Sequence, residues 1–245
     1  MEKKRLDILL VEMGFCSTRT RAQEMIRDGF VTVDGEKNIK PGEKISPSSS
    51  IALLKKEHPY VSRGGIKLNA ALEHFKIEPR GKIALDVGSS TGGFTHCLLL
   101  HGAERVYAVD VGTGQLVESL RSHPQVKYWE QMSIQTFPTE FVGAGVDIIV
   151  VDVSFVSLKK IIPFLRRYLK TQGSVILLIK PQFEVGPENI NKQGIVRAKN
   201  LYEVVLQEIE YTARVAGFVT QGTMLSPILG GDGNTEFFLH MIRAD

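Results

Sequence analysis

The feature that most constrains this chain is an apolar run that ends in a glycine-rich turn, residues 83–95, with the sequence IALDVGSSTGGFT. The run predicts a buried strand, and a helix is expected to begin near Thr91 with Phe94 on its inner side. Glycines at positions 88, 92 and 93 let a ligand approach the backbone, and a helix N-terminus offers open N–H donors. The stretch therefore predicts a ligand site at a strand–turn–helix unit.

An acid at the end of a second apolar strand indicates what kind of ligand this is. The segment 106–110 places Asp110 where a doubly wound sheet holds a ribose diol. The turn lacks the dinucleotide spacing G-x-G-x-x-G, because three residues separate Gly88 from the next glycine. Asp86 would repel a pyrophosphate but suits a cationic sulfonium. The residues favour S-adenosylmethionine as the cofactor; the alternatives are a nicotinamide or flavin nucleotide, and a glycine-rich loop without a ligand.

Length and composition are typical of a folded protein with two domains. The 245 residues leave room for a small domain and a large one, and a polar linker near 55–61 predicts domains over 1–59 and 60–245. The two cysteines, Cys16 and Cys97, indicate neither a disulfide framework nor a metal site. The N-terminus does not resemble a secretory signal, and the longest apolar segment is shorter than the ~20 residues of a membrane helix. We expect a cytoplasmic protein that binds neither a membrane nor a metal.

The first quarter of the chain carries the excess of positive charge. Residues 1–67 hold 13 Lys and Arg against 9 Asp and Glu, and the remainder holds 17 against 18. Contact with nucleic acid and a solvated basic face would both explain this excess. The pattern predicts a helix over 5–13, a second helix from an N-cap at Ser17 to Gly29, strands at 31–33 and 51–53, and a turn at Asp34-Gly35.

Two helices followed by a small sheet, with arginines on the second helix, resemble the S4 RNA-binding domain. The matching residues are Arg5-Leu-Asp, Ser17-x-Arg19-x-x-Ala22, Ile26, Gly29, Val31-x-Val33 and Gly35. The resemblance implies a small α+β domain that holds RNA through phosphate contacts and shape. The expected RNA-binding residues are Arg5, Arg19, Arg21, Lys37 and Arg63.

From Val61 onward, apolar strands alternate with helical patterns. Strands are predicted at 83–87, 105–109, 126–129, 146–151, 174–179, 217–222 and 235–241, and helices at 67–75, 93–101, 116–122, 158–168 and 202–216. This alternation predicts a Rossmann-like α/β domain with a doubly wound sheet of seven strands. By analogy with methyltransferases of this architecture, the last strand is expected to run antiparallel.

Two of the predicted strands end on charged residues that burial of an apolar core does not explain. Asp152 and Lys180 each come directly after an aliphatic run, and the carboxyl ends of parallel strands form the edge where ligands bind. A strand that simply emerges into solvent is the alternative. Lys67 lies before the first strand of the sheet, and Glu236 begins the last one.

These four residues match, in order and in topological place, the Lys-Asp-Lys-Glu tetrad of FtsJ-like 2′-O-ribose methyltransferases. Together with the S4-like module and the motifs VSRGGIK at 61–67, DVSFVSL at 152–158 and KPQFEVG at 180–186, they make nearly the whole chain resemble the TlyA family, whose members are often labelled hemolysin A. The resemblance implies S-adenosylmethionine-dependent methylation of a cytidine 2′-hydroxyl in ribosomal RNA. The small subunit is the expected target and the large subunit a second candidate.

The resemblance also implies a role for each residue of the site. Lys180 would act as the general base or orient the hydroxyl, and Asp152 would orient Lys180. Lys67 would supply a neighbouring positive charge, and Glu236 would position Lys67 or the ribose. No metal is needed, because the sulfonium leaves as a neutral thioether. The expected cofactor-binding residues are Asp86, Gly88, Ser89, Ser90, Gly92, Gly93, Phe94, Asp110, Val111, Met132 and Asp152.

One segment departs from the family pattern. The Glu-Arg-x-Asn sequence that the family often shows near adenine is here Glu130-Gln-Met-Ser133, and we expect Glu130 and Met132 to flank the adenine. The segment 184–199 is expected to be either a mobile basic loop over the site or an ordinary connection.

Two other functions stay open at this stage: a catalytically inactive RNA-binding protein that serves ribosome assembly, and a membrane-active hemolysin. The intact tetrad argues against the first. The second predicts an apolar span or a strongly amphipathic basic helix, and the sequence contains neither. Asp-Val-Ser-Phe at 152–155, in place of an Asn/Asp-Pro-Pro-aromatic motif, argues against methylation of an exocyclic amine.

Overall fold

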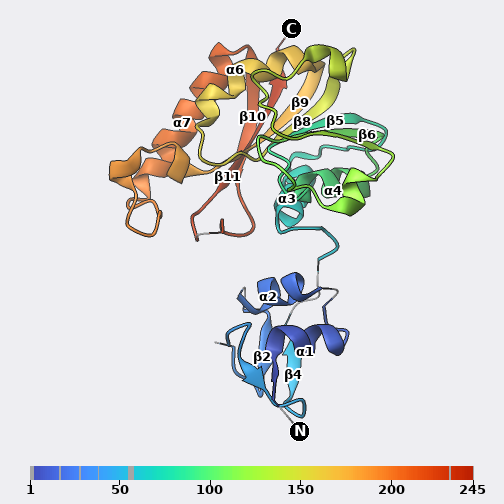
Figure 1. The fold of residues 1–245 in the computed structure, drawn as a ribbon. Coiled ribbons are helices and arrows are strands. Elements are labelled where there is room, and N and C mark those ends of the chain that lie inside the picture. The colour runs from blue at the N-terminus through green and yellow to red at the C-terminus, as the bar shows by residue number, and fades with distance from the viewer. Residues whose placement is uncertain are drawn as a thin grey trace. The chain divides into compact units, whose positions relative to one another are not determined.

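The computed structural model describes residues 3–16, 18–27, 29–37, 39–54, 58–231 and 233–244. Its contacts divide the chain into two compact units, residues 1–59 and 60–245 (Figure 1). The predicted N-cap Ser17 and residues 55–57 of the predicted linker lie outside the described residues.

The N-terminal unit consists of two short helices and two small antiparallel sheets. The helices are α1 (Leu6–Glu12) and α2 (Arg19–Arg27); strand β1 (Lys4–Arg5) pairs with β3 (Lys44–Ile45), and β2 (Val31–Val33) pairs with β4 (Ile51–Leu53). Apolar side chains of α1, α2 and β2 form one core, in which Leu6, Leu10 and Ala22 are fully buried. The predicted turn after β2 is confirmed, since Asp34 and Gly35 have φ values of 52° and 87°.

The C-terminal unit is built on a seven-stranded sheet, as predicted. The strands are β5 (Ile83–Val87), β6 (Arg105–Val109), β7 (Val126–Trp129), β8 (Val146–Val151), β9 (Leu169–Ile179), β10 (Phe218–Leu225) and β11 (Phe237–Arg243), in the order β10-β11-β9-β8-β5-β6-β7. The strands from β5 to β9 pair in parallel, whereas β11 lies between β9 and β10 and is antiparallel to both.

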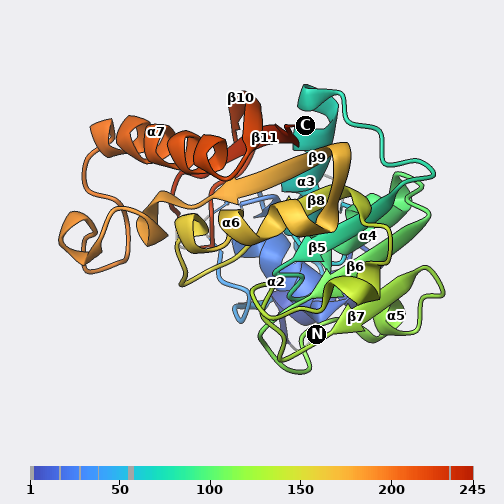
Figure 2. The same cartoon turned by 90° about the horizontal axis from the view of Figure 1, so that it is seen from above.

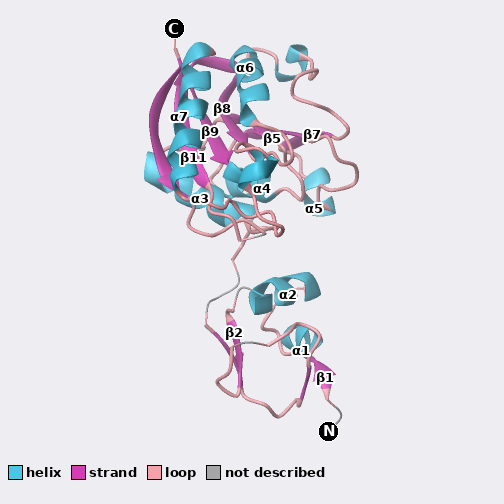
Figure 3. Cartoon of the chain, turned by 90° about the vertical axis from the view of Figure 1, so that its left-hand side faces the viewer, coloured by secondary structure: helices cyan, strands magenta, loops and turns pink. Residues whose placement is uncertain are grey.

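Helices cover both faces of this sheet (Figures 2 and 3). They are α3 (Gly64–Phe75), α4 (Gly93–Leu100), α5 (Glu118–Arg121), α6 (Ile162–Leu165) and α7 (Asn200–Val215). Successive side chains of a strand point to opposite faces. Accordingly, Leu85 and Ile149 pack in a core with α6 and α7, while Ala84 and Ile148 pack in a second core with α3 and α4.

Several predicted boundaries in this unit are wrong, and strand β10 also ends three residues later than predicted. The helix predicted over 158–168 is split into 3-10 turns at Leu158–Lys160 and Arg166–Tyr168 on either side of α6, because Pro163 cannot donate within a helix. Strand β9 starts five residues earlier than predicted and α3 three residues earlier, while β11 starts two residues later, so Glu236 precedes the strand. Further 3-10 turns cover Thr139–Val142, Pro181–Phe183 and Pro187–Asn189.

Candidate active site

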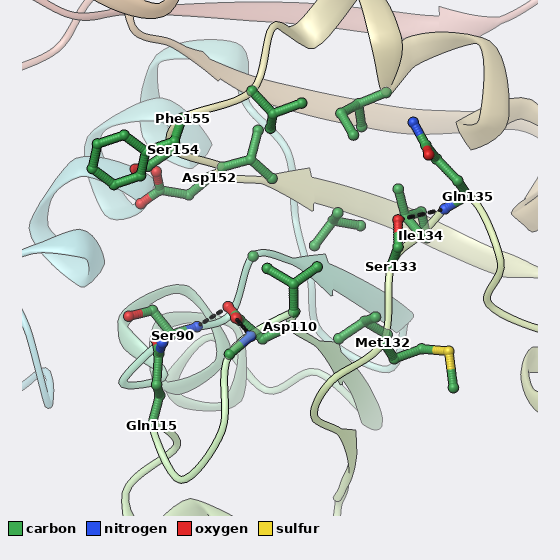
Figure 4. Close-up of a pocket in the computed structure, with 18 residues that line it drawn as sticks. Ser90, Asp110, Gln115, Met132, Ser133, Ile134, Gln135, Asp152, Ser154 and Phe155 are labelled. Carbon is green, nitrogen blue, oxygen red and sulfur yellow. Dashed lines mark hydrogen bonds between the residues drawn. The ribbon is translucent and has the colours of Figure 1, made fainter.

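Two cavities lie where the parallel strands end. The larger, about 650 Å³, is lined by residues that follow β5, β6, β7 and β8; Figure 4 shows Asp152, Ser154 and Phe155 on one wall, and Ser90, Asp110 and Met132 among the residues of the others. The smaller, about 110 Å³, is lined by Ser62, Gly64, Lys67, Gly88, Ser89, Ser90, Thr91, Gly93, Phe94 and Asp152. Gly88, Ser90 and Asp152 line both cavities, so the two adjoin.

The glycine turn after β5 is shaped by close backbone contacts. Gly88 has a φ of +83°, and a Cβ at this position would lie 2.3 Å from the carbonyl oxygen of Asp152. A Cβ on Gly93 would lie 2.2 Å from Oγ of Ser62. The backbone contact and the positive φ require glycine at position 88, whereas at position 93 the Ser62 side chain would have to move and the backbone of Gly65 lies 3.1 Å away.

Gly92 plays a different part from the one the sequence predicts. It is absent from the walls of both cavities. Its φ is +97°, and a Cβ would meet Leu120 at 2.3 Å and Leu116 at 2.8 Å. The glycine at this position therefore serves the backbone turn into α4 and the close packing of the segment around α5.

Asp110 follows β6 and lines the larger cavity. One carboxylate oxygen accepts the N–H of Ser90 at 2.8 Å, and the other accepts the N–H of Gly112 at 2.7 Å (Figure 4). These bonds fix the carboxylate between two turns. Each carboxylate oxygen has a second lone pair, so the group can still accept hydrogen bonds from a diol.

Asp86 lies within β5 and is completely buried. One of its oxygens accepts the hydroxyl of Thr95 at 2.7 Å, and the other has no hydrogen-bond partner. Burial raises the pKa of Asp86 to about 7, and the nearby carboxylates of Asp152 and Asp110 add to the rise. The side chain is not part of either cavity wall, contrary to the direct contact that the sequence predicts.

Lys67 and Glu236 form a buried ion pair. Nζ of Lys67 lies 2.5 Å from a carboxylate oxygen of Glu236, and the side chains are only 10% and 2% exposed. Lys67 comes from the first turns of α3, and Glu236 from the residue before β11. The antiparallel direction of β11 brings its N-terminal end to the carboxyl edge of β9, where Phe237 pairs with Ile179.

Lys180 and Asp152 form a second ion pair at the same edge. Nζ of Lys180 lies 2.6 Å from Oδ1 of Asp152 and donates a hydrogen bond of 2.8 Å to the hydroxyl of Ser154. The Asp152 oxygen makes no well-aligned hydrogen bond, so its contact with the amine is an ion pair alone. Lys67 and Asp152 line the same small cavity, which brings the two predicted lysine–carboxylate pairs together.

The turn that follows β8 contains a feature that sequence reasoning missed. Phe155 has a φ of +63° and is 90% exposed, although it lines the larger cavity. Its ring packs against Phe183, with centroids 5.0 Å apart. A bulky residue at positive φ is rare in proteins and is found mostly at functional sites.

Glu184 was also missed. Its carboxylate accepts the hydroxyl of Ser157 at 2.5 Å and the N–H of Leu158 at 2.7 Å, and burial raises its pKa. Both motifs that contain these residues stood out in the sequence, but no pattern within either one indicated that they bond to each other.

The part of the larger cavity where the sequence predicts an adenine differs partly from expectation. Met132 and Val111 line the cavity, as does the unpredicted residue Gln115. Glu130 instead accepts the N–H groups of Gly114 and Gln115 and pairs with Arg121 at 2.7 Å. Glu130 therefore shapes the 112–116 turn and is not part of the cavity wall.

Most of the predicted RNA-binding arginines have partners within the protein. Arg5 and Arg19 both hydrogen-bond to the fully buried carboxylate of Asp7, and Arg5 holds the pKa of Asp7 well below its usual value. The Arg21 side chain is only 11% exposed, between Glu24 and His58. Of the other two predicted residues, Lys37 is exposed, and Arg63 donates a hydrogen bond to the carbonyl of Leu229.

The segment 184–199 is tied to the loop before Glu236. The buried side chain of Asn234 accepts the N–H of Val196 at 3.1 Å and donates to the carbonyl of Gly194 at 2.9 Å. Ile190 and Val196 form an isolated antiparallel bridge. These bonds favour an ordered connection over a mobile loop.

None of the helices within the described ranges is long and apolar enough to cross a membrane. No group of three or more His, Cys, Asp or Glu in the same ranges could hold a metal ion.

Comparisons with known proteins agree with this geometry. Residues 60–243 match the FtsJ-like methyltransferase family, and residues 4–51 match the S4 domain. The chain is 42% identical over 241 residues to "Putative rRNA methyltransferase YqxC" of Bacillus subtilis, covering 98% of this chain and 86% of that one. It is 38% identical over 238 residues to the 16S/23S rRNA (cytidine-2′-O)-methyltransferase TlyA of Mycobacterium tuberculosis, covering 97% and 89%. A solved structure described as "Putative hemolysin from Streptococcus thermophilus" aligns with a TM-score of 0.78 at 42% identity, over 100% of this chain and 90% of that one.

Proposed function

Because the chain belongs to the FtsJ-like methyltransferase family, among the TlyA proteins that also carry an S4 domain, we propose that it methylates a cytidine 2′-hydroxyl in ribosomal RNA with S-adenosylmethionine as the donor. The observation that carries the proposal is that each of two lysine–carboxylate pairs contributes one residue, Lys67 or Asp152, to the wall of the small cavity beside the glycine turn. The 16S rRNA is the first candidate target and the 23S rRNA the second.

The residues at the glycine turn fit S-adenosylmethionine. The missing side chain at Gly88 lets a ligand approach the backbone beside Asp152. The unpaired buried oxygen of Asp86 lies one strand residue before the turn. With a pKa of about 7, this carboxyl is partly ionised near neutral pH, and its negative charge would favour a cationic ligand. Asp110 would hold the ribose hydroxyls, and Met132 and Val111 would contact the adenine.

When bound, S-adenosylmethionine supplies a methyl group on a sulfonium that leaves as a neutral thioether. The protein must then position the 2′-hydroxyl and accept its proton. Lys180 would orient the hydroxyl as an ammonium, or accept its proton at Nζ after first releasing a proton of its own, while Asp152 and Ser154 keep the amine in place. Lys67, held by Glu236, would add a positive charge near the oxygen that loses the proton.

Two further features support RNA as the acceptor. Phe155 presents an exposed ring at the cavity wall, and unpaired RNA bases bind by stacking on such rings. The N-terminal unit, the S4 domain, would bind the surrounding RNA through basic side chains such as Lys37. Three arginines of this unit, Arg5, Arg19 and Arg21, are bonded to acidic side chains within the protein. They would therefore stabilise the RNA-binding surface as well as contact phosphates.

The test is transfer of a labelled methyl group from S-adenosylmethionine to ribosomal subunits and to bare rRNA, with the modified nucleotide mapped by mass spectrometry. We expect 2′-O-methylcytidine. Lys180→Ala should lower kcat by about 10²- to 10⁴-fold and leave cofactor affinity nearly unchanged. Lys170→Ala is a matched control, because Lys170 lies near the start of β9, whereas Lys180 follows its end, and Lys170 is also paired to a carboxylate, that of Asp147.

Other outcomes identify the alternatives. Tight RNA binding without methyl transfer would favour an inactive assembly protein. Release of dye from liposomes without cofactor would favour a membrane-active protein. Full turnover by the Lys180→Ala variant would exclude Lys180 as the proton acceptor.

A further inference from the structure

The turn between Asp152 and Leu158 holds an exposed aromatic ring in an unfavourable conformation. Phe155 gains little from burial at 90% exposure, and its φ of +63° is disfavoured for a residue with a large side chain. The conformation therefore depends on contacts made by the residues on either side of it. A second segment, residues 180–184, provides these contacts.

The two segments are joined at both ends. At the start of the turn, Lys180 pairs with Asp152 and donates to Ser154. At its end, Glu184 accepts the hydroxyl of Ser157 and the N–H of Leu158. The turn is thus fixed on both sides of Phe155, by a base on one side and an acid on the other.

The hydrogen bonds of Ser157 have a defined direction. Its oxygen accepts the N–H of Lys159 at 3.2 Å, so its single proton is left to donate to Glu184 at 2.5 Å. The carboxylate of Glu184 thus receives two donors, one on each oxygen. It lies outside both cavity walls and both of its side-chain bonds go to the turn, so we expect its effect on the reaction to pass through the turn.

We propose that Glu184 is a positioning residue that holds Phe155 in place as the contact surface for the target nucleotide, and so sets the distance between that nucleotide and Lys180. This inference rests on the proposed function. It predicts that loss of Glu184 weakens use of the RNA substrate much more than binding of the cofactor, because only the turn changes.

The experiment compares steady-state methylation by the full chain and its variants, with cofactor affinity measured separately. Glu184→Ala removes two hydrogen bonds to a charged acceptor and should raise KM for RNA by at least about tenfold. Cofactor Kd should stay within about twofold. Glu184→Gln keeps one acceptor for the N–H of Leu158 and should restore part of the loss. Glu208→Gln is the matched control, since Glu208 pairs with Lys159 beside the turn but binds neither Ser157 nor Leu158; it should behave as wild type.

A double-mutant cycle separates this role from a merely structural one. If Glu184 acts through Phe155, Glu184→Ala should add little to the KM of a Phe155→Ala variant. Wild-type KM in Glu184→Ala, or fully additive effects in the cycle, would overturn the inference. If Glu184→Ala does not fold, Ser157→Ala removes one of the same bonds and gives the same two outcomes. Failure of the wild-type chain to methylate any RNA would instead refute the proposed function.

Discussion

Replacing Lys67 or Glu236 with an apolar side chain is expected to reduce stability as well as methyl transfer. The two groups come from α3 and from the residue before β11, and their ion pair of 2.5 Å is almost closed to solvent, with side chains 10% and 2% exposed. Either single replacement leaves the other charge buried without its partner. The double replacement leaves no unpaired charge.

The magnitude follows from that burial. Removing one partner of a buried ion pair costs about 3–5 kcal/mol, whereas replacing both with apolar side chains of similar volume is often neutral. For a domain of this size, about 1 kcal/mol shifts Tm by roughly 2–4 °C. Lys67→Met and Glu236→Leu should therefore each lower Tm by about 6–20 °C. The double variant should recover most of this loss.

The assay is thermal unfolding of the three variants and the wild type, with methyl transfer to rRNA measured on the same samples below their transitions. All three variants should be inactive, including the stable double variant, because the charge near the reacting oxygen is gone. Equal destabilisation of all three variants, or a loss under about 1 kcal/mol in both single variants, would refute the reasoning from burial. Activity in the double variant would refute the role of Lys67.

Three other predictions address the cofactor site and the RNA surface. Gly88→Ala should abolish binding of S-adenosylmethionine, measured by calorimetry, because its Cβ would lie 2.3 Å from the carbonyl oxygen of Asp152. Gly114→Ala, whose new Cβ has no atom within 4 Å, should keep more affinity. Equal affinities of the two variants would contradict this prediction. Because burial raises the pKa of Asp86 from 3.8 to about 7, the folded state retains a proton that the unfolded state releases, so stability should fall by up to about 4 kcal/mol as pH rises from 4 to 7. Measured by urea unfolding, the stability of Asp86→Asn should decrease less between pH 4 and 7 than that of the wild type. An equal decrease in both proteins would contradict the raised pKa of Asp86. Lys37→Ala should reduce the dependence of log K for RNA on log salt by about 0.7–1; the same slope in the variant would remove Lys37 from the RNA contacts.

The central sheet could be predicted because its inner strands are mostly apolar, with single charged residues such as Asp86 in β5 and Asp147 in β8. Strands β5 to β8 have the predicted bounds, and the charged residues after β8 and before β11 lie at the predicted edge of the sheet. The start of β9 was missed because Gln172 and Gly173 interrupt the apolar pattern. A strand that is buried on both faces is apolar along nearly its whole length, so its bounds can be predicted from its own residues.

Contacts between distant segments could not be predicted in the same way. The bond from Glu184 to Ser157 spans 27 residues, and that from Arg19 to Asp7 spans 12. The residues next to Glu184 or Asp7 in the sequence do not distinguish these acids from carboxylates exposed to solvent. The sequence therefore predicted which residue types gather at the site, whereas the buried acids that hold them became visible only in the folded chain.

The position of β11 has a consequence for synthesis on the ribosome. This strand is the last to emerge, yet it is inserted between β9 and β10, which have no pairing with each other. A nascent chain that has not reached residue 236 lacks the carboxylate partner of Lys67 and exposes two bare strand edges, which are prone to misassociation. If the proposed role of the Lys67–Glu236 pair holds, we expect methyl transfer to begin only after β11 has filled the gap between β9 and β10.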